Sequence, residues 1–131
     1  MILDTSVIIA SLRGERGAID LDSRLDGMRV SVVNLTEVFH AARRRNVETT
    51  PEEIEETLVA AGVEIVTPTR DTARFAAAFM SAEPPKGYSR ISLGDGFCLA
   101  HAFEYGEPAL TGDRAWTAIP LPFPVKIELI R

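Results

Sequence analysis

The stretch SLGDGFCLAHAFEYGEPALTGD, residues 92–113, contains the signals for a helix, a stop and a strand in direct succession. Its spacing predicts a helix over 93–105 that is capped by Ser92 and ended by Gly106. The run PALT, residues 108–111, then predicts a short apolar strand. A helix that leads at once into a strand is typical of an α/β sheet.

The same alternation continues through the rest of the chain. Strands are expected over 1–4, 29–33, 63–66, 108–111 and 125–130, and the expected helices begin after caps at Ser6, Asn34, Thr50, Thr69 and Ser92. The helix after Asn34 is expected to continue through Arg45, and residues 19–25 to form a second helix or an irregular stretch. The pattern predicts an α/β fold: one domain over residues 1–131, with a mostly parallel central sheet and helices on both faces.

The amino-acid composition limits the kinds of function that the chain can have. With 131 residues, 46% hydrophobic and 25% charged, the chain fits a single globular domain. No apolar run approaches the ~20 residues of a membrane span, and a signal peptide is lacking, so we expect no membrane contact and a cytoplasmic location. The single cysteine, Cys98, excludes an internal disulfide and is expected to be a buried helix residue. The net charge of −5 argues mildly against a general nucleic-acid binder.

Four acidic residues stand where expected strands give way to helices: Asp4, Glu37, Asp95 and Asp113. The carboxyl ends of parallel strands share one edge of a sheet, so these side chains are expected to converge. Two carboxylates about 5 Å apart repel by roughly 3 kcal/mol at an effective dielectric near 20. Such a cluster favours a hard divalent cation with oxygen ligands, Mg²⁺ or Mn²⁺.

Each acid also has a structural alternative. Glu37 and Asp95 have the spacing of capping boxes behind Asn34 and Ser92. Asp4 and Asp113 could serve as helix caps or turn residues. For each acid taken alone, the structural role is at least as well supported as a metal-binding role. Only the joint pattern of the four acids favours a metal site.

The motifs LDTSVI, NLTEV, SLGDGFCLA and LTGDRAW, in this order over nearly the whole chain, resemble those of PIN-domain ribonucleases, most closely the VapC-like toxins of bacterial toxin–antitoxin pairs. The resemblance implies that Asp4, Glu37, Asp95 and Asp113 form the catalytic, metal-binding quartet. It further implies hydroxyl contacts from Thr5 or Ser6 and from Thr111, RNA as the substrate, and an antitoxin whose C-terminal segment occupies the cleft.

Hydrolysis of a phosphodiester would need an activated water and relief of charge on phosphorus, which one or two Mg²⁺ ions can supply. We expect Asp4, Asp95 and Asp113 to be direct ligands, and Glu37 to act through water or to orient the attacking water. Candidate substrate contacts, chosen by proximity to the motifs, are Thr5, Ser6, Arg43, Arg44, Lys86, Arg90, Thr111 and Arg114. For Trp116, core packing is preferred over stacking on a base.

Apolar stripes in IEETLVAAG and RFAAAFM could serve a homodimer or an antitoxin, although use in the protein's own core is the default. Two departures from the family pattern are the short first strand and the glycines that flank Asp95, which lower helix propensity there. The alternatives to a nuclease are a non-catalytic interaction module and, less favoured, an aspartyl-nucleophile phosphatase. Against the phosphatase, Ser6 replaces the acid expected two residues after Asp4.

Overall fold

The computed structural model describes residues 1–44 and 48–130, in which strands and helices alternate. The strands are β1 (Ile2–Leu3), β2 (Arg29–Ser31), β3 (Glu64–Val66), β4 (Ala109–Thr111) and β5 (Ile127–Leu129). The helices are α1 (Thr5–Leu12), α2 (Val32–Arg44), α3 (Pro51–Ala61), α4 (Arg70–Met80), α5 (Leu93–Tyr105) and the short 3-10 helix η1 (Arg114–Thr117).

The five strands form one sheet in the order β3-β2-β1-β4-β5, and all four pairings are parallel. This confirms the predicted α/β class, with a sheet that is parallel throughout. The first strand lies in the centre, where Ile2 is in register with Arg29 on one side and Ala109 on the other. The residue after β1, Asp4, therefore emerges at the middle of the sheet's carboxyl edge.

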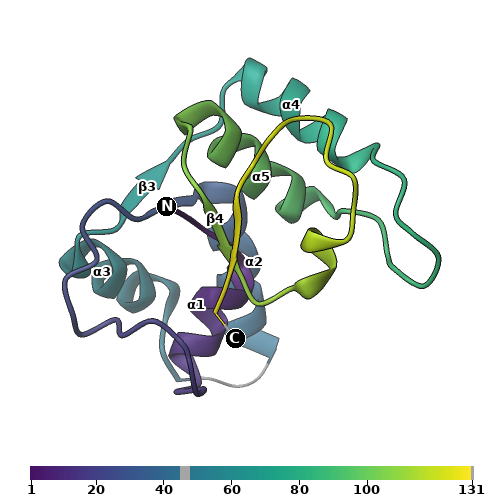
Figure 1. Cartoon of the computed structure of the whole chain (residues 1–131). Coiled ribbons are helices and arrows are strands. Elements are labelled where there is room, and N and C mark those ends of the chain that lie inside the picture. The colour runs from purple at the N-terminus through teal and green to yellow at the C-terminus, as the bar shows by residue number, and fades with distance from the viewer. Residues whose placement is uncertain (45–47, 131) are drawn as a thin grey trace.

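Helices cover both faces of the sheet, as predicted (Figure 1). Successive residues of a strand point to opposite faces, so Leu3 packs with α1, α2 and α3 while Ile2 packs with α4 and α5. The stripes expected on α3 and α4 belong to these cores: Leu58 and Phe79 are both fully buried. Cys98 is buried in the second core, which confirms its structural assignment.

Several helix boundaries follow the local signals. Thr50 Oγ1 accepts a hydrogen bond from Glu53 N at 3.2 Å, and α3 stops at Gly62 in the left-handed region at φ 97°. Thr69 caps α4 with a full capping box. Ser92 Oγ accepts from Asp95 N at 3.2 Å at the start of α5, the helix predicted over 93–105. Helices α3 and α5 each have a capping side chain at the start and a left-handed glycine, Gly62 or Gly106, at the end. Such signals set the bounds of a helix without contacts to distant residues.

Two predicted caps are wrong. Helix α1 is capped by Asp4, which accepts from Thr5 N at 2.8 Å, so Ser6 lies inside the helix. Asn34 lies inside α2, because β2 ends at Ser31 and the chain enters the helix at Val32. The Ser31 hydroxyl accepts from Val33 N at 3.2 Å and serves this helix end in place of Asn34.

Residues 13–28 form turns and irregular segments. Of the two structures predicted for residues 19–25, a helix or an irregular stretch, the irregular stretch is therefore present. Gly14, Gly17 and Gly27 have positive φ there, which interrupts any helix. Helix α2 extends to Arg44, and the predicted continuation to Arg45 lies outside the described residues. Within residues 1–44 and 48–130, each helix is too short or too polar to cross a membrane.

Candidate active site

The sheet topology brings the four acids to one edge. Asp4 follows β1 and Asp113 follows β4, and these two strands are parallel neighbours. Helix α2 starts at the end of β2 and carries Glu37 in its second turn. Asp95 does not follow a strand, contrary to expectation; it reaches the same edge because α5 runs back towards the start of β4, with its N-terminus at the carboxyl edge.

Asp4 is the buried centre of the group, with only 4% of its surface exposed. Its Oδ1 accepts from Thr5 N at 2.8 Å, and its Oδ2 accepts from Ser6 Oγ at 2.7 Å and Thr111 Oγ1 at 2.8 Å. Burial raises the pKa of Asp4 despite these hydrogen bonds, and repulsion from Glu37 adds to the rise. The site therefore carries negative charge that the surrounding donors do not fully compensate.

The hydroxyl groups of Ser6 and Thr111 link Asp4 to the chain after β4. Thr111 Oγ1, which donates to Asp4, accepts from Asp113 N at 3.0 Å. Ser6 Oγ in turn accepts from Gly112 N at 3.0 Å. These contacts hold the Asp113 turn against the start of α1.

Glu37 is exposed and is held from the side by α1. Its Oε1 accepts from Thr5 Oγ1 at 2.7 Å and, at 3.5 Å, from Asn34 Nδ2. Asn34 is completely buried, and its Nδ2 also donates to Thr5 Oγ1 at 3.1 Å and to Gly94 O at 3.1 Å. The capping-box alternative for Glu37 is wrong, because Asn34 binds α1 and α5 from inside the helix instead of capping it.

Gly94 is in direct contact with this carboxylate. A Cβ built on Gly94 would lie 2.5 Å from Glu37 Cδ and 2.7 Å from Oε2, closer than any side chain tolerates. Gly96, the other glycine beside Asp95, would meet Ala76 O of α4 at 3.0 Å. Both glycines therefore permit close approach, which explains their presence in a helix despite their low propensity.

Asp95 carries the clearest electrostatic sign of convergence. Burial raises the pKa of Asp95 to about 6, repulsion from Asp4 and then from Asp113 adds to the rise, and hydrogen bonds from Ser92 act against it. The pKa of the Cys98 thiol is also raised, first by burial and then by Asp4, Asp95 and Glu37. These couplings join all four carboxylates into one negative region.

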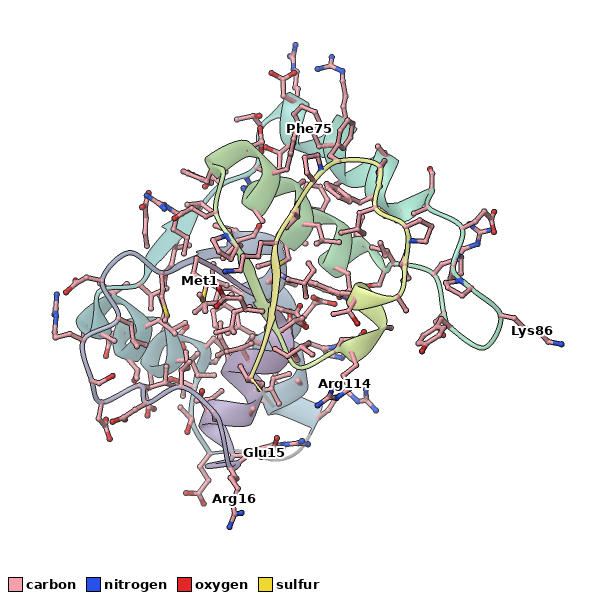
Figure 2. All side chains as sticks on the ribbon, viewed as in Figure 1. Met1, Glu15, Arg16, Phe75, Lys86 and Arg114 are labelled. Carbon is pink, nitrogen blue, oxygen red and sulfur yellow. The ribbon has the colours of Figure 1, made fainter. Side chains whose placement is uncertain are left out.

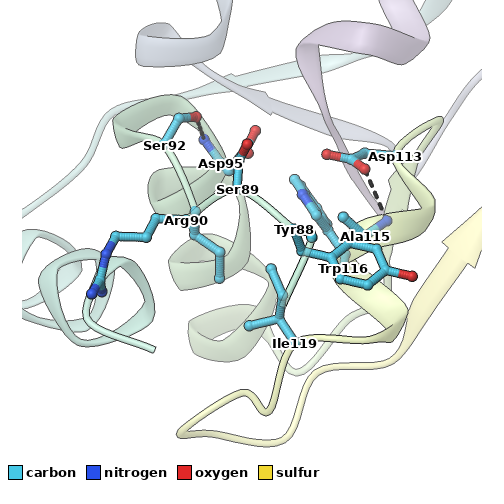
Figure 3. Close-up of a pocket in the computed structure, with 11 residues that line it drawn as sticks. Tyr88, Ser89, Arg90, Ser92, Asp95, Asp113, Ala115, Trp116 and Ile119 are labelled. Atoms are coloured by element: carbon cyan, nitrogen blue, oxygen red, sulfur yellow. Dashed lines mark hydrogen bonds between the residues drawn. The ribbon is translucent and has the colours of Figure 1, made fainter. Parts of the chain in front are cut away.

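Asp113 is exposed and caps η1, accepting from Ala115 N at 2.9 Å. The structural alternatives for Asp4 and Asp113 are thus realised, and they coexist with convergence of the acids. Asp95 and Asp113 line the same pocket, which has a volume of about 360 Å³ (Figure 3).

The donor set fits a hard divalent cation, although the side chains are not gathered around a common point. Within residues 1–44 and 48–130, no three His, Cys, Asp or Glu side chains form a ready cage. The carboxylates of Asp4 and Glu37 are turned towards hydroxyl groups instead. Carboxylate oxygens with raised pKa values are suitable ligands for Mg²⁺ or Mn²⁺, because the cation would neutralise the repulsion.

The candidate basic contacts are spread around this edge. Arg43 and Arg44 are exposed in the last turn of α2, roughly 9 Å along the axis from Glu37. Arg90 forms an ion pair with Glu83 at 2.6 Å and lines the pocket beside Asp95. Arg114 begins η1. Lys86 extends from the tip of the α4–α5 loop, well away from the edge of the sheet that carries the acids (Figure 2).

The sequence analysis missed the positioning roles of Asn34 and Gly94. Asn34 was interpreted as a cap from its spacing to Glu37, and Gly94 only as a residue that lowers helix propensity. A glycine in the first turn of a helix, next to an acid, was the available signal of a close approach. The buried amide gave no comparable signal.

Comparison with known proteins identifies relatives. A family model described as PIN domain matches residues 1–120. Ribonuclease VapC42 of Mycobacterium tuberculosis and a VapC ribonuclease of Mycobacterium bovis are each 33% identical over 115 residues, covering 84% of this chain and 88% of the relative.

Solved structures share the fold. VapBC2 from Rickettsia felis, bound to a DNA fragment from its promoter, aligns with a TM-score of 0.71 at 15% identity, covering 98% of this chain and 96% of that one. VapC20 of Mycobacterium tuberculosis, described as a Sarcin-Ricin loop cleaving toxin, aligns with a TM-score of 0.67 at 16% identity, covering 94% and 98%. At these identities the likeness concerns the fold alone.

Proposed function

The chain belongs to the PIN-domain family, and from this premise we propose that it is a metal-dependent endoribonuclease, the toxin of a type II toxin–antitoxin pair. One observation carries the proposal for this chain. Four acids from separate elements lie at the carboxyl edge of a parallel sheet, and mutual repulsion helps to raise the pKa values of Asp4 and Asp95. An enzyme that hydrolyses phosphodiesters with a divalent cation needs this arrangement.

Asp4, Asp95 and Asp113 are the proposed ligands of Mg²⁺ or Mn²⁺, with Glu37 ligating through water or orienting the attacking water. The cation, when bound, would supply Lewis-acid stabilisation of the phosphate and a more acidic water. Ser6 and Thr111 fix the Asp4 carboxylate through Oδ2. Thr5 Oγ1 donates a hydrogen bond to Glu37 Oε1. The other oxygen, Oε2, is left to accept a hydrogen bond from the attacking water.

The partners follow from the same proposal. RNA is the substrate, with Arg43, Arg44, Arg90 and Arg114 as the candidate phosphate contacts, and a cognate antitoxin inhibits the site. Solved structures with this fold include toxin–antitoxin complexes, which supports an antitoxin partner. We also propose that residues 1–131 act as one nuclease domain, that it forms a homodimer, and that it acts in the cytoplasm where its RNA substrates are made.

A phosphatase in which Asp4 is the nucleophile is disfavoured by the residue two positions later. Ser6 stands where such an enzyme carries a second acid, and its hydroxyl donates to Asp4 Oδ2 at 2.7 Å. The non-catalytic module is tested directly by the experiment below.

The test is to incubate the purified protein with a total RNA pool in Mg²⁺ and in EDTA, and to map new 5′ ends. Cleavage at defined sites in Mg²⁺, absent in EDTA and in an Asp95→Asn variant, is expected. Cells that express the chain alone are expected to stop growing and to recover when the adjacent reading frame is co-expressed. Intact RNA from the wild-type protein in Mg²⁺ would leave only the interaction module.

A further inference from the structure

The pocket beside the acids has a wall that the proposed hydrolysis does not use. Asp95 and Asp113 form its acidic side, and the loop over 87–92, Trp116 and Ile119 form the remainder (Figure 3). Its volume of about 360 Å³ exceeds that of a single nucleobase. A group bound there would lie directly next to the reacting phosphate.

Trp116 contributes an unusual polar atom to this wall. The side chain is 2% exposed, and among the described residues no partner lies within hydrogen-bonding distance of its Nε1. A buried N–H without a partner costs free energy unless a ligand or water satisfies it. Figure 3 shows the indole ring rising from η1 towards the space between Asp95 and Asp113. Because Nε1 is covered in the unbound protein, a small shift of the pocket wall would bring a bound ligand within reach of it.

The rest of the pocket suits a flat, uncharged group. Tyr88 leaves 47% of its surface exposed at the rim, and Ile91 and Ile119 are buried apolar residues. Asp95 and Asp113 repel an anion. Aromatic, apolar and donor groups without net positive charge are the features of a nucleobase subsite.

We propose that this pocket binds the nucleobase next to the scissile phosphate, with the C4 carbonyl of uracil or the C6 carbonyl of guanine accepting from Trp116 Nε1 and the ring stacking on Tyr88. The inference rests on the proposed endoribonuclease function and adds a base preference to it. Because Nε1 only donates, the pocket favours an oxo base, uracil or guanine, over the corresponding amino base. Trp116 and Tyr88 are therefore specificity-determining residues.

The sole tryptophan makes the pocket directly observable, because all Trp emission comes from Trp116. The metal-free protein in EDTA is titrated with four nucleosides in matched pairs, uridine against cytidine and inosine against adenosine. Uridine and inosine are expected to change the emission saturably, at lower concentration than their amino partners. Tyr88→Ala is expected to weaken this binding about tenfold through loss of stacking, and Tyr88→Phe, which keeps the ring, to retain it.

The donor itself is tested through cleavage. Trp116→Phe is expected to cut RNA in Mg²⁺ with a weaker preference for uracil or guanine at the cut site, whereas Tyr88→Phe keeps the wild-type pattern. Trp116 is a core residue. If Trp116→Phe fails to fold, the comparison of oxo and amino nucleosides with the wild-type protein still tests the donor.

The outcomes separate this inference from the function on which it rests. The pocket proposal is overturned if no nucleoside changes the emission at millimolar concentration, if oxo and amino nucleosides act alike, or if Tyr88→Ala binds like wild type. It is also overturned if acetyl-alanine amide changes the emission and nucleosides do not, which would assign the pocket to a protein partner. Nucleoside binding without any RNA cleavage would instead overturn the proposed nuclease and leave the base-binding pocket standing.

Discussion

Gly94, in the first turn of α5, and Glu37, in α2, approach so closely that a Cβ on Gly94 would lie 2.5 Å from Glu37 Cδ. The two helices are also joined there by Asn34 Nδ2, which donates to Gly94 O at 3.1 Å. The position of one proposed catalytic acid therefore depends on the absence of a side chain on another helix.

Gly94→Ala is expected to displace the Glu37 carboxylate and to lower RNA cleavage by about 10- to 100-fold, the usual range for losing support of a metal-site group. The thermal midpoint should fall little, because the clash meets a flexible, exposed side chain and alanine favours the helix. Cleavage assays and thermal unfolding measure the two effects.

Gly96→Ala is the matched control for this prediction. Its Cβ would meet the Ala76 carbonyl oxygen of α4 at 3.0 Å, so it should lower the thermal midpoint more than Gly94→Ala does. Equal activities for Gly94→Ala and wild type would contradict the proposed role of the Glu37 position.

Asp4→Asn is expected to lower cleavage by at least about a hundredfold, because it removes a proposed ligand and not merely the support of one. Its stability should be unchanged or higher, since burial raises the pKa of Asp4 and a neutral amide avoids that cost. Asparagine also keeps an oxygen for the cap on Thr5 N. Glu56→Gln, on the exposed face of α3, is the control, and activity in Asp4→Asn equal to that of Glu56→Gln would rule out the proposed ligand set.

Thr5→Val removes the hydroxyl that donates to Glu37 Oε1 at 2.7 Å while it keeps the shape of the side chain. We expect cleavage to fall about 10- to 100-fold and the free energy of unfolding to fall by only about 1 kcal/mol. Thr36→Val is a suitable comparison, because that hydroxyl donates within α2 to Val32 O. A similar loss of activity in both variants would point to a general effect on the helix.

The metal-free protein is expected to become more stable through Asp95 as the pH falls. The pKa of Asp95 is about 6 in the folded protein against an ordinary value of 3.8. Between these values the folded state holds a proton that the unfolded state releases, so this contribution rises as the pH falls through 6 and levels off near 4. Asp95→Asn lacks the contribution.

The measurement is the difference in thermal midpoint between wild type and Asp95→Asn in EDTA, from pH ~7.5 to ~5. The advantage of the variant should shrink as the pH falls. His101, whose pKa is lowered by burial, acts in the opposite direction but is common to both proteins and cancels. A difference that stays constant with pH would show that Asp95 has an ordinary pKa.

Mn²⁺ is expected to stabilise the folded protein because it neutralises the acidic edge. At about a hundred times its dissociation constant, a ligand of the folded state adds about 2.7 kcal/mol. The rise in thermal midpoint should be largely lost in Asp95→Asn and kept in Glu56→Gln. Equal shifts in all three proteins would place the bound ion elsewhere.

Local signals in the sequence were sufficient for much of this fold. The cap at Thr50 and the stop at Gly62 act within one helix, and so do Ser92 and Gly106. Such signals involve contacts over three or four residues, and the helices that they predict are present.

The error at Asn34 arose because asparagine can either cap a helix or bind distant residues from inside one. The spacing from Asn34 to Glu37 is that of a capping box, yet β2 ends early at Ser31 and places Asn34 inside α2. Its amide binds Thr5 and Gly94, which lie far away in the sequence. The sequence motifs placed the four acids at one edge of the sheet, where the structure has them, but the hydrogen bonds that orient them depend on tertiary packing.

The bond from Thr111 to Asp4 spans 107 positions of the chain. During synthesis on the ribosome, the segment that carries Asp4 emerges long before the one that supplies Thr111, Gly112 and Asp113. An interrupted translation product that lacks β4 therefore has neither the support of its central carboxylate nor a fourth acid. Such a nascent fragment is expected to have no nuclease activity, because the proposed site needs the chain through Asp113.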